Sequence, residues 1–211
     1  MHRVDLGSSE YPSLLSQMQN PPKSLYIEGK LDVFGGKTLV VVGSRSLTPY
    51  GEAVVKNFVG LLASRGVVIV SGLARGVDAL AHETCLGAGG VAVGVLGFGF
   101  DFLSGQSVAP LARRVAASGA LISPFLPSQK AEKRTFLERN KIMAGVSKAV
   151  LVIEATAKSG VFSTVNMAIE LGRDVFVVPG SVFSYTSMGC HELIKEGAYL
   201  ITSPDDILSR M

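Results

Sequence analysis

The chain has 211 residues, enough for one sizeable domain. Only 18% of the residues are charged and the mean hydropathy is +0.38, so the composition is too apolar for a disordered chain. Lysine and arginine number 20 against 17 acidic residues, which gives a net charge of +3 at pH 7. This mild basic excess permits a nucleic acid partner but does not require one.

The sequence also predicts the compartment. The first ten residues contain no apolar stretch, so we expect no signal peptide. The uncharged run from Thr84 to Phe100 is shorter than the roughly 20 residues of a membrane-spanning helix, and six glycines interrupt it. Cys85 and Cys190 are the only cysteines, which excludes a disulfide scaffold. We therefore expect a cytoplasmic protein with no membrane association.

Five short apolar runs are candidate β-strands. They are rich in β-branched residues and are continuous, with no alternation of apolar and polar positions. This pattern favours strands of a parallel sheet that is covered on both faces. The runs are residues 38–42, 67–70, 91–96, 149–153 and 175–178.

Helical patterns separate these runs. Thr48 suits an N-cap, Pro49 suits the first helical position, and Gly66 ends the apolar spacing that follows. Further helices are expected near residues 76–88, 107–118, 135–146, 162–172 and 190–196. The alternation predicts a doubly wound α/β fold, with helices on both faces of a mostly parallel sheet. Residues 1–36 are expected to be a lead-in segment that packs on the sheet, and residues 127–134 a long loop.

Three of the predicted strands end in turns that combine glycine with serine, threonine or arginine. Because the carboxyl ends of parallel strands meet at one edge of a sheet, these turns should converge there. Glycine lets backbone N–H groups approach an anion, and the start of the next helix adds partial positive charge. A phosphate site is therefore predicted, against the alternative of ordinary strand–helix turns. The residues concerned are Gly43, Ser44, Arg45, Ser71, Gly72, Arg75, Ser159, Gly160 and Thr164.

The familiar nucleotide-binding signatures are incomplete. Gly36-Lys37-Thr38 resembles the end of a Walker A loop, but Leu31 stands where the first glycine is required and the triplet precedes a strand. Gly97-Phe98-Gly99 continues without the rest of the dinucleotide fingerprint. ATP hydrolysis and NAD binding are therefore disfavoured, and we expect no cofactor.

Asp78 and His82 lie four residues apart, on one face of a predicted helix. They could form a general-base pair, but no evident Ser or Cys nucleophile accompanies them. We favour structural support, in which Asp78 stabilises the helix N-terminus and His82 pairs with Asp78. Cys85 and Cys190-His191 lack the spacing of metal ligands. The sequence thus predicts neither a metal site nor a catalytic residue.

Positive charge is concentrated in residues 129–148. This segment holds six basic and two acidic residues, a local charge of +4, so the rest of the chain sums to about −1. Phe136 lies among these charges. Basic residues with an interleaved aromatic can follow a phosphate backbone and stack a base, although a solvated helix face would give the same pattern.

Several motifs, in their order and spacing from about Tyr11 to Leu208, resemble the DNA-processing protein A (DprA/Smf) family. The resemblance implies an extended Rossmann-like domain, here residues 37–211, that binds single-stranded DNA without catalysis. It also implies a homodimer that helps to load the recombinase RecA onto incoming DNA during natural transformation. The motifs are Gly43-Ser44-Arg45, residues 71–82, Arg139-Asn140-Lys141, Glu154-Ala155, Ser159-Gly160 and Val178-Pro179-Gly180.

The resemblance also assigns residues to the site. Arg45, Arg139, Asn140 and Lys141 would line a DNA-phosphate pocket, with small hydrogen-bonding groups from Ser71, Gly72, Ser159 and Gly160 and support from Asp78 and His82. The family's Arg-Asn-Arg is here Arg139-Asn140-Lys141, which keeps the charge but loses bidentate phosphate geometry. The length leaves no room for the flanking helical and winged-helix domains of many members, so we expect the central domain alone.

Two other classes of protein remain open. A Rossmann-like nucleotide sensor or a phosphoribohydrolase-like enzyme would share the glycine turns and a nearby basic residue. The glycine-rich helix start of such enzymes is absent, because Pro179-Gly180 continues as Ser181-Val182-Phe183. A pure interaction protein is the third possibility, since the apolar composition is compatible with a subunit interface.

Overall fold

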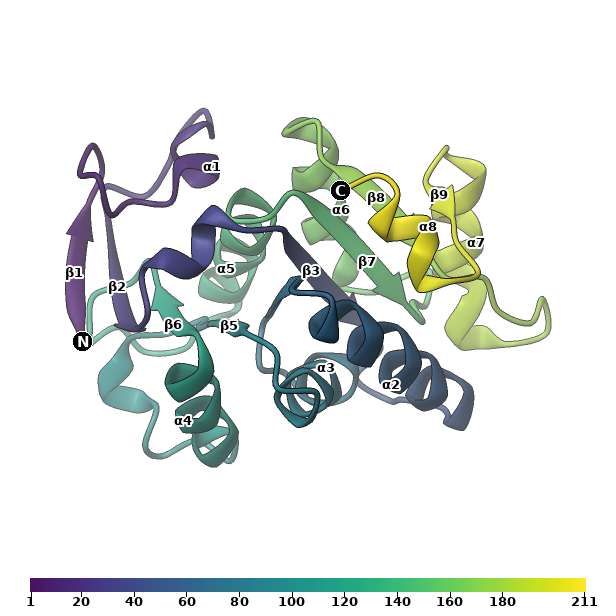
Figure 1. The fold of residues 1–211 in the computed structure, drawn as a ribbon, viewed down its shortest axis with the longest axis horizontal. Helices are drawn as coiled ribbons and strands as arrows, with labels where there is room; N and C mark the ends of the chain where they lie inside the picture. Colours follow the sequence, from purple (N-terminus) through teal and green to yellow (C-terminus); the bar gives the residue numbers. More distant parts are fainter.

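One nine-stranded sheet runs through the computed structural model, which describes all 211 residues (Figure 1). The strand order is β1-β2-β6-β5-β4-β3-β7-β8-β9. All neighbours from β6 to β9 in this order pair in parallel, whereas β1–β2 and β2–β6 pair antiparallel. The strands are β1 His2–Asp5, β2 Ser24–Gly29, β3 Thr38–Gly43, β4 Val68–Ser71, β5 Ala92–Val95, β6 Ala120–Ser123, β7 Ala149–Ile153, β8 Asp174–Val177 and β9 Tyr199–Leu200.

Helices cover both faces of this sheet. Helices α2, α3, α4 and α8 contribute buried side chains to one hydrophobic cluster, and α1, α5, α6 and α7 to the other. In Figure 1, α2, α3 and α4 lie along the lower side of the sheet. The helices are α1 Ser13–Ser16, α2 Pro49–Ser64, α3 Val77–Gly87, α4 Ala109–Ser118, α5 Lys133–Gly145, α6 Val161–Glu170, α7 Met188–Lys195 and α8 Pro204–Leu208, with 3-10 turns η1 Asp32–Gly35, η2 Phe100–Phe102 and η3 Tyr185–Ser187.

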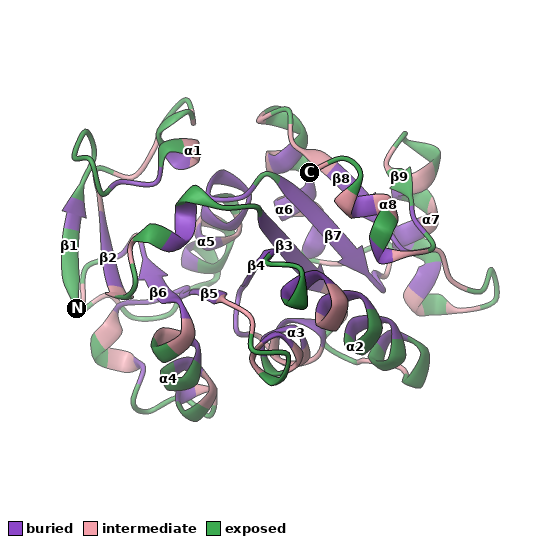
Figure 2. Ribbon diagram, viewed as in Figure 1, coloured by how far each residue is buried: buried purple, intermediate pink, exposed green.

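The central strands are buried on both faces, as their continuous apolar sequences predict. In β3, Val40 and Val42 pack into one cluster, while Leu39 and Val41 pack into the other. Figure 2 shows the central strands buried, with exposed residues on the helices around them. The doubly wound fold is therefore confirmed, and each of the five predicted strands agrees with an observed one to within one residue at each end.

Helix α2 confirms the predicted start and end signals. The Thr48 side chain accepts a hydrogen bond from the Gly51 N–H at 3.1 Å, and Pro49 occupies the first helical position. Gly66 follows the last turn with a φ of +79°, a conformation that a side chain would disfavour. The other predicted helices correspond to α3 to α7. None of the helices is both long enough and apolar enough to span a lipid bilayer.

The lead-in segment differs from its prediction. Residues 1–36 do not only pack on the sheet: β1 and β2 extend it, because β2 pairs with β6 and β1 with β2. Leu15 of α1 is fully buried in the same cluster as α5. One sheet therefore contains strands from both sides of residue 36, and the division of the chain into two parts at that residue stays a prediction.

Candidate nucleic-acid interface

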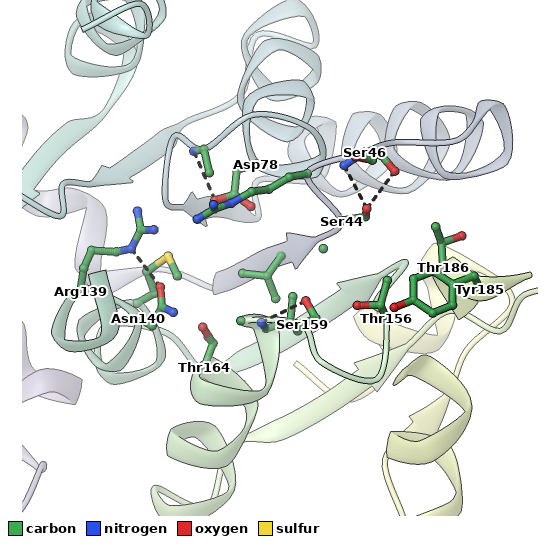
Figure 3. Close-up of a pocket in the computed structure, with 17 residues that line it drawn as sticks. Ser44, Ser46, Asp78, Arg139, Asn140, Thr156, Ser159, Thr164, Tyr185 and Thr186 are labelled. Carbon is green, nitrogen blue, oxygen red and sulfur yellow. Dashed lines mark hydrogen bonds between the residues drawn. The ribbon is translucent and has the colours of Figure 1, made fainter. Parts of the chain in front are cut away.

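The strand order reverses between β3 and β7. From β3 the chain builds the sheet outward through β4, β5 and β6, and from β7 it builds the other side through β8 and β9. Ligands of doubly wound folds bind in the crevice at such a switch point, beyond the carboxyl ends of the strands. A pocket of about 600 Å³ opens there (Figure 3).

The first wall of the pocket is the turn after β3. Gly43 is required there, because a Cβ at this position would lie 1.8 Å from the Ile153 carbonyl oxygen. Ser44 closes the turn on Ser46, donating from Oγ to the Ser46 carbonyl at 2.8 Å and accepting from the Ser46 N–H at 3.0 Å. Arg45 lies between them, exposed, with no hydrogen bond or ion pair to the protein. Its guanidinium is therefore available to a ligand.

The opposite wall is the start of α6. Ser159, Gly160 and Thr164 line the pocket at this helix N-terminus, across from Ser44 and Ser46 in Figure 3. The free backbone N–H groups and the dipole of a first helical turn favour an anion.

Contacts to α5 fix the position of α6. The Asn140 Nδ2 group donates to Ser163 Oγ at 2.7 Å, and Ser163 Oγ in turn donates to the Gly160 carbonyl at 2.8 Å. These hydrogen bonds link α5 to the first turn of α6, where Ser159 and Gly160 line the pocket.

Glu154 connects three elements around the pocket. Its carboxylate accepts hydrogen bonds from the Thr48 N–H at 3.1 Å, from the Thr48 hydroxyl, and from the Thr186 hydroxyl at 3.2 Å. Glu154 is buried at the end of β7 and has a φ of +55°, a strained value for a residue with a side chain. This one carboxylate therefore ties the N-terminus of α2 and the turn η3 to the carboxyl end of β7.

Arg139 forms the inner end of the pocket and is only 4% exposed. Its Nη1 group donates to the Gly72 carbonyl and, at 3.0 Å, to the Val95 carbonyl, while Nε donates to Asn140 Oδ1 at 3.0 Å. A Cβ on Gly72 would lie 2.2 Å from Nη1 of Arg139, so a side chain at this position would displace the guanidinium. Arg139 therefore fastens α5 to the ends of β4 and β5 besides lining the pocket.

Asp78 lies close to Arg139 at the start of α3. Its Oδ2 atom accepts hydrogen bonds from the N–H groups of Gly72, at 3.1 Å, and Ala74, at 3.4 Å. Burial raises the pKa of the Asp78 carboxyl, and the Arg139 charge opposes that rise. Burial likewise lowers the pKa of the Arg139 guanidinium, and Asp78 opposes that change. Asp78 lies in the first turn of α3, where it was predicted to stabilise the helix N-terminus, but its hydrogen bonds go to the turn after β4. It also lines the pocket, and its supporting role stays a prediction.

The predicted pairing of His82 with Asp78 is wrong. Neither ring nitrogen of His82 has a hydrogen-bond partner, and the side chain is fully buried. Burial lowers the pKa of His82 to about 4, so the ring is neutral at pH 7. The Ser71 backbone opposes this shift, and the positive charge of Arg139 adds to it. Asp78 instead bonds to backbone N–H groups within its own turn, which an i, i+4 spacing in the sequence could not reveal.

Eight of the twelve predicted phosphate-binding residues line the pocket, and four do not. Ser71 is buried and donates to the Val41 carbonyl at 2.7 Å, and the Gly72 carbonyl accepts a hydrogen bond from Arg139. Arg75 and Lys141 are exposed outside the pocket lining. The eight that line it are Gly43, Ser44, Arg45, Arg139, Asn140, Ser159, Gly160 and Thr164.

Sequence reasoning missed several lining residues, among them Ser46, Thr156, Tyr185 and Thr186. The last two come from η3, more than a hundred residues beyond the first wall. The available signal was the hydroxyl-rich run that follows Pro179. With these residues, the pocket combines two arginines and one carboxylate with many hydroxyl groups, a composition suited to an anionic ligand.

The fold and this pocket define a Rossmann-like α/β protein with an arginine- and hydroxyl-lined pocket at its switch point. The sequence profile of the family described as DNA recombination-mediator protein A matches residues 2–211, and the chain belongs to this family. The resemblance found from the motifs is thus confirmed.

Individual relatives agree with this assignment. Protein Smf of Escherichia coli is 41% identical over the whole chain, which spans 56% of the length of Smf. The X-ray structure of DNA processing protein A from Streptococcus pneumoniae has a TM-score of 0.93 and 36% identity, over 99% of this chain and 73% of that one. DNA processing protein A from Helicobacter pylori, whose single-stranded DNA binding mode is described, has a TM-score of 0.88 and 27% identity, over 99% and 94% of the two chains.

Proposed function

We propose that the protein binds single-stranded DNA through the pocket between β3 and β7. The observation that carries this proposal is Arg45, an exposed guanidinium without a protein partner, which lines the same hydroxyl-rich crevice as the N-terminus of α6. Each of these groups binds phosphate oxygens well. Membership of the recombination-mediator family and the binding mode described for the H. pylori relative support DNA as the source of those phosphates.

The pocket favours binding over chemistry. Its one lining carboxylate, Asp78, already accepts two backbone hydrogen bonds, and His82 is buried outside the lining. No residue pair in the lining therefore combines a nucleophile with a free base. Contacts to phosphates carry no sequence information, so we expect binding with little base preference and without nucleotide hydrolysis.

We further propose that the protein acts as a homodimer that presents single-stranded DNA to the recombinase RecA in the cytoplasm. The family description supports the recombination role. Exposed apolar side chains on the short edge strand β9 (Leu200) and on α6 (Ile169) support self-association. The free, buried thiols of Cys85 and Cys190 fit a reducing compartment. Sedimentation at tens of micromolar protein would contradict the dimer if it showed only a 22.1 kDa species.

Fluorescence anisotropy with a labelled oligonucleotide tests the main proposal. Single-stranded DNA should bind more tightly than the same sequence as a duplex. If about four phosphates are contacted, the plot of log affinity against log salt concentration should have a slope near −3. A slope near zero, or equal affinity for free nucleoside monophosphates, would instead indicate a small-ligand site.

A further inference from the structure

The loop after β8 exposes aromatic side chains at the mouth of the pocket. Phe183 is 96% exposed, Val182 76% and Tyr185 65%, whereas aromatic side chains normally bury most of their surface. Tyr185 also lines the pocket (Figure 3), so this apolar cluster is continuous with the proposed phosphate site. We name residues 180–186 the aromatic loop. It projects from the same end of the molecule as the carboxyl ends of β7 and β8 (Figure 1).

Hydrogen bonds hold the aromatic loop at both of its ends. The Tyr50 hydroxyl donates to the Pro179 carbonyl at 2.6 Å just before the loop, and the Thr186 hydroxyl donates to Glu154 at its end. Within the loop, the Phe183 N–H donates to Ser181 Oγ at 3.3 Å. Phe183 is therefore exposed on a loop whose two ends are held by hydrogen bonds.

Nothing in the folded chain explains a phenyl ring at this position. Phe183 belongs to neither hydrophobic cluster. The aromatic loop also has no charged residue, so it carries no carboxylate that would repel a phosphate backbone. Its apolar tip, next to an anion pocket, has the composition of a surface that binds both the bases and the backbone of an unpaired strand.

We propose that Phe183 and Tyr185 form a stacking platform for the unpaired bases of a strand whose phosphates lie in the pocket. This inference rests on the proposed function. The Cα atoms of Phe183 and Tyr185 are at most about 7.6 Å apart, so the Phe183 ring is within reach of a strand that is held at Tyr185. Stacking on a phenyl ring uses the π-face that every base has, which agrees with binding that has little sequence preference.

The first test compares a normal oligonucleotide with an abasic one of the same length. The wild-type protein should bind the normal strand more tightly, because only that strand can stack. Phe183→Ala should weaken binding to the normal strand on the order of tenfold and leave binding to the abasic strand unchanged. Leu6→Ala, which removes an exposed apolar side chain beside β1 at the opposite edge of the sheet, is the control and should alter neither affinity.

A second test uses the absence of tryptophan from the chain. Phe183→Trp creates a single indole on the loop, and its emission should be quenched by the normal strand but not by the abasic one. Leu6→Trp places the same fluorophore after β1, at the opposite edge of the sheet, and should not respond to either strand. Both variants keep an exposed residue exposed, so neither is expected to disturb the fold.

The outcomes separate this proposal from the proposed function. If wild-type protein binds neither strand, both proposals fail. If it binds DNA but Phe183→Ala has the affinity of wild type for both strands, the platform alone is refuted. The platform is also refuted if Phe183→Ala reduces affinity for both strands equally while sedimentation shows that self-association is lost, because the loop is then a contact between copies of the chain.

Discussion

The two arginines of the pocket differ in what their guanidinium groups contact. Arg45 stands on the β3 turn, exposed and without a protein partner, whereas Arg139 is buried and donates to carbonyl oxygens at the ends of β4 and β5. The sequence predicts the same phosphate-binding role for both. One arginine of the pocket is thus free to bind a ligand, whereas the other bonds to the backbone that forms the pocket. Substitution of Arg45 should therefore change the affinity for the ligand, and substitution of Arg139 should change the stability of the fold.

The largest expected effect is on folding, from Arg139→Ala. The substitution leaves the buried carbonyls of Gly72 and Val95 without their donor and removes the positive charge that partly compensates Asp78. We expect the free energy of unfolding to fall by about 3–5 kcal/mol. Urea denaturation measures this loss, with Arg45→Ala as the control within about 0.5 kcal/mol of wild type. Equal stability of the two variants would show that both arginines are free for the ligand.

The second effect is a dependence of folding stability on pH, which arises from the buried His82. The pKa of His82 is about 4 in the folded protein, against an ordinary value of 6.5. The unfolded chain therefore takes up a proton as the pH falls through 6.5, while the folded protein does so only near 4. The stability that neutral His82 confers is fully present above pH 6.5 and is lost as the pH falls towards 4.

His82→Leu should remove this dependence. Between pH 7 and pH 4 the wild type should lose roughly 3 kcal/mol more than the variant, as measured by urea denaturation across the range. At pH 7 the variant should be at least as stable, since it removes two buried nitrogens that have no partner. Parallel pH profiles for the two proteins would mean that the imidazole has a partner in solution.

The third effect is on affinity, from Arg45→Ala. A charge-assisted contact between a guanidinium and a phosphate is worth on the order of 1.5–3 kcal/mol, so single-strand affinity should fall roughly tenfold to a hundredfold. The melting temperature should not change. Lys148→Ala removes an equal charge immediately before β7. Lys148 lies at the amino end of this strand, whereas the pocket lies at the carboxyl ends, so the substitution should leave affinity almost intact. Unchanged binding by Arg45→Ala would move the phosphate site elsewhere.

The division between Arg45 and Arg139 shows where prediction from sequence ends. Apolar runs and a cap such as Thr48 act locally, so five strands and the helices between them could be placed from the sequence. Strand β6 follows α4 with only Gly119 between them, so no loop marked its start. Its position became clear only from its pairing with β5 and β2.

The candidate site shows the same limit. The turns after β3 and β7 converge because parallel strands share a carboxyl edge, which the order of the elements already implies. Whether a side chain in such a turn is free depends on distant partners. Arg139 is buried by carbonyls 67 and 44 residues away, and Glu154 is bonded by Thr48 from 106 residues away. Contacts of this length have no signature in local sequence.

The smallest expected effect is that of Lys141→Ala. Lys141 is adjacent to Asn140 in the sequence, yet it is exposed and lies outside the pocket lining. An ammonium on a flexible stem at such a position acts as a loosely placed charge, so its removal should lower affinity by less than about threefold. The salt slope tests this more sharply than affinity does, because each lost phosphate contact reduces it by about 0.7. A reduction near 0.7 would show that the DNA extends from the pocket along α5; an unchanged slope confines its charged contacts to the Arg45 side.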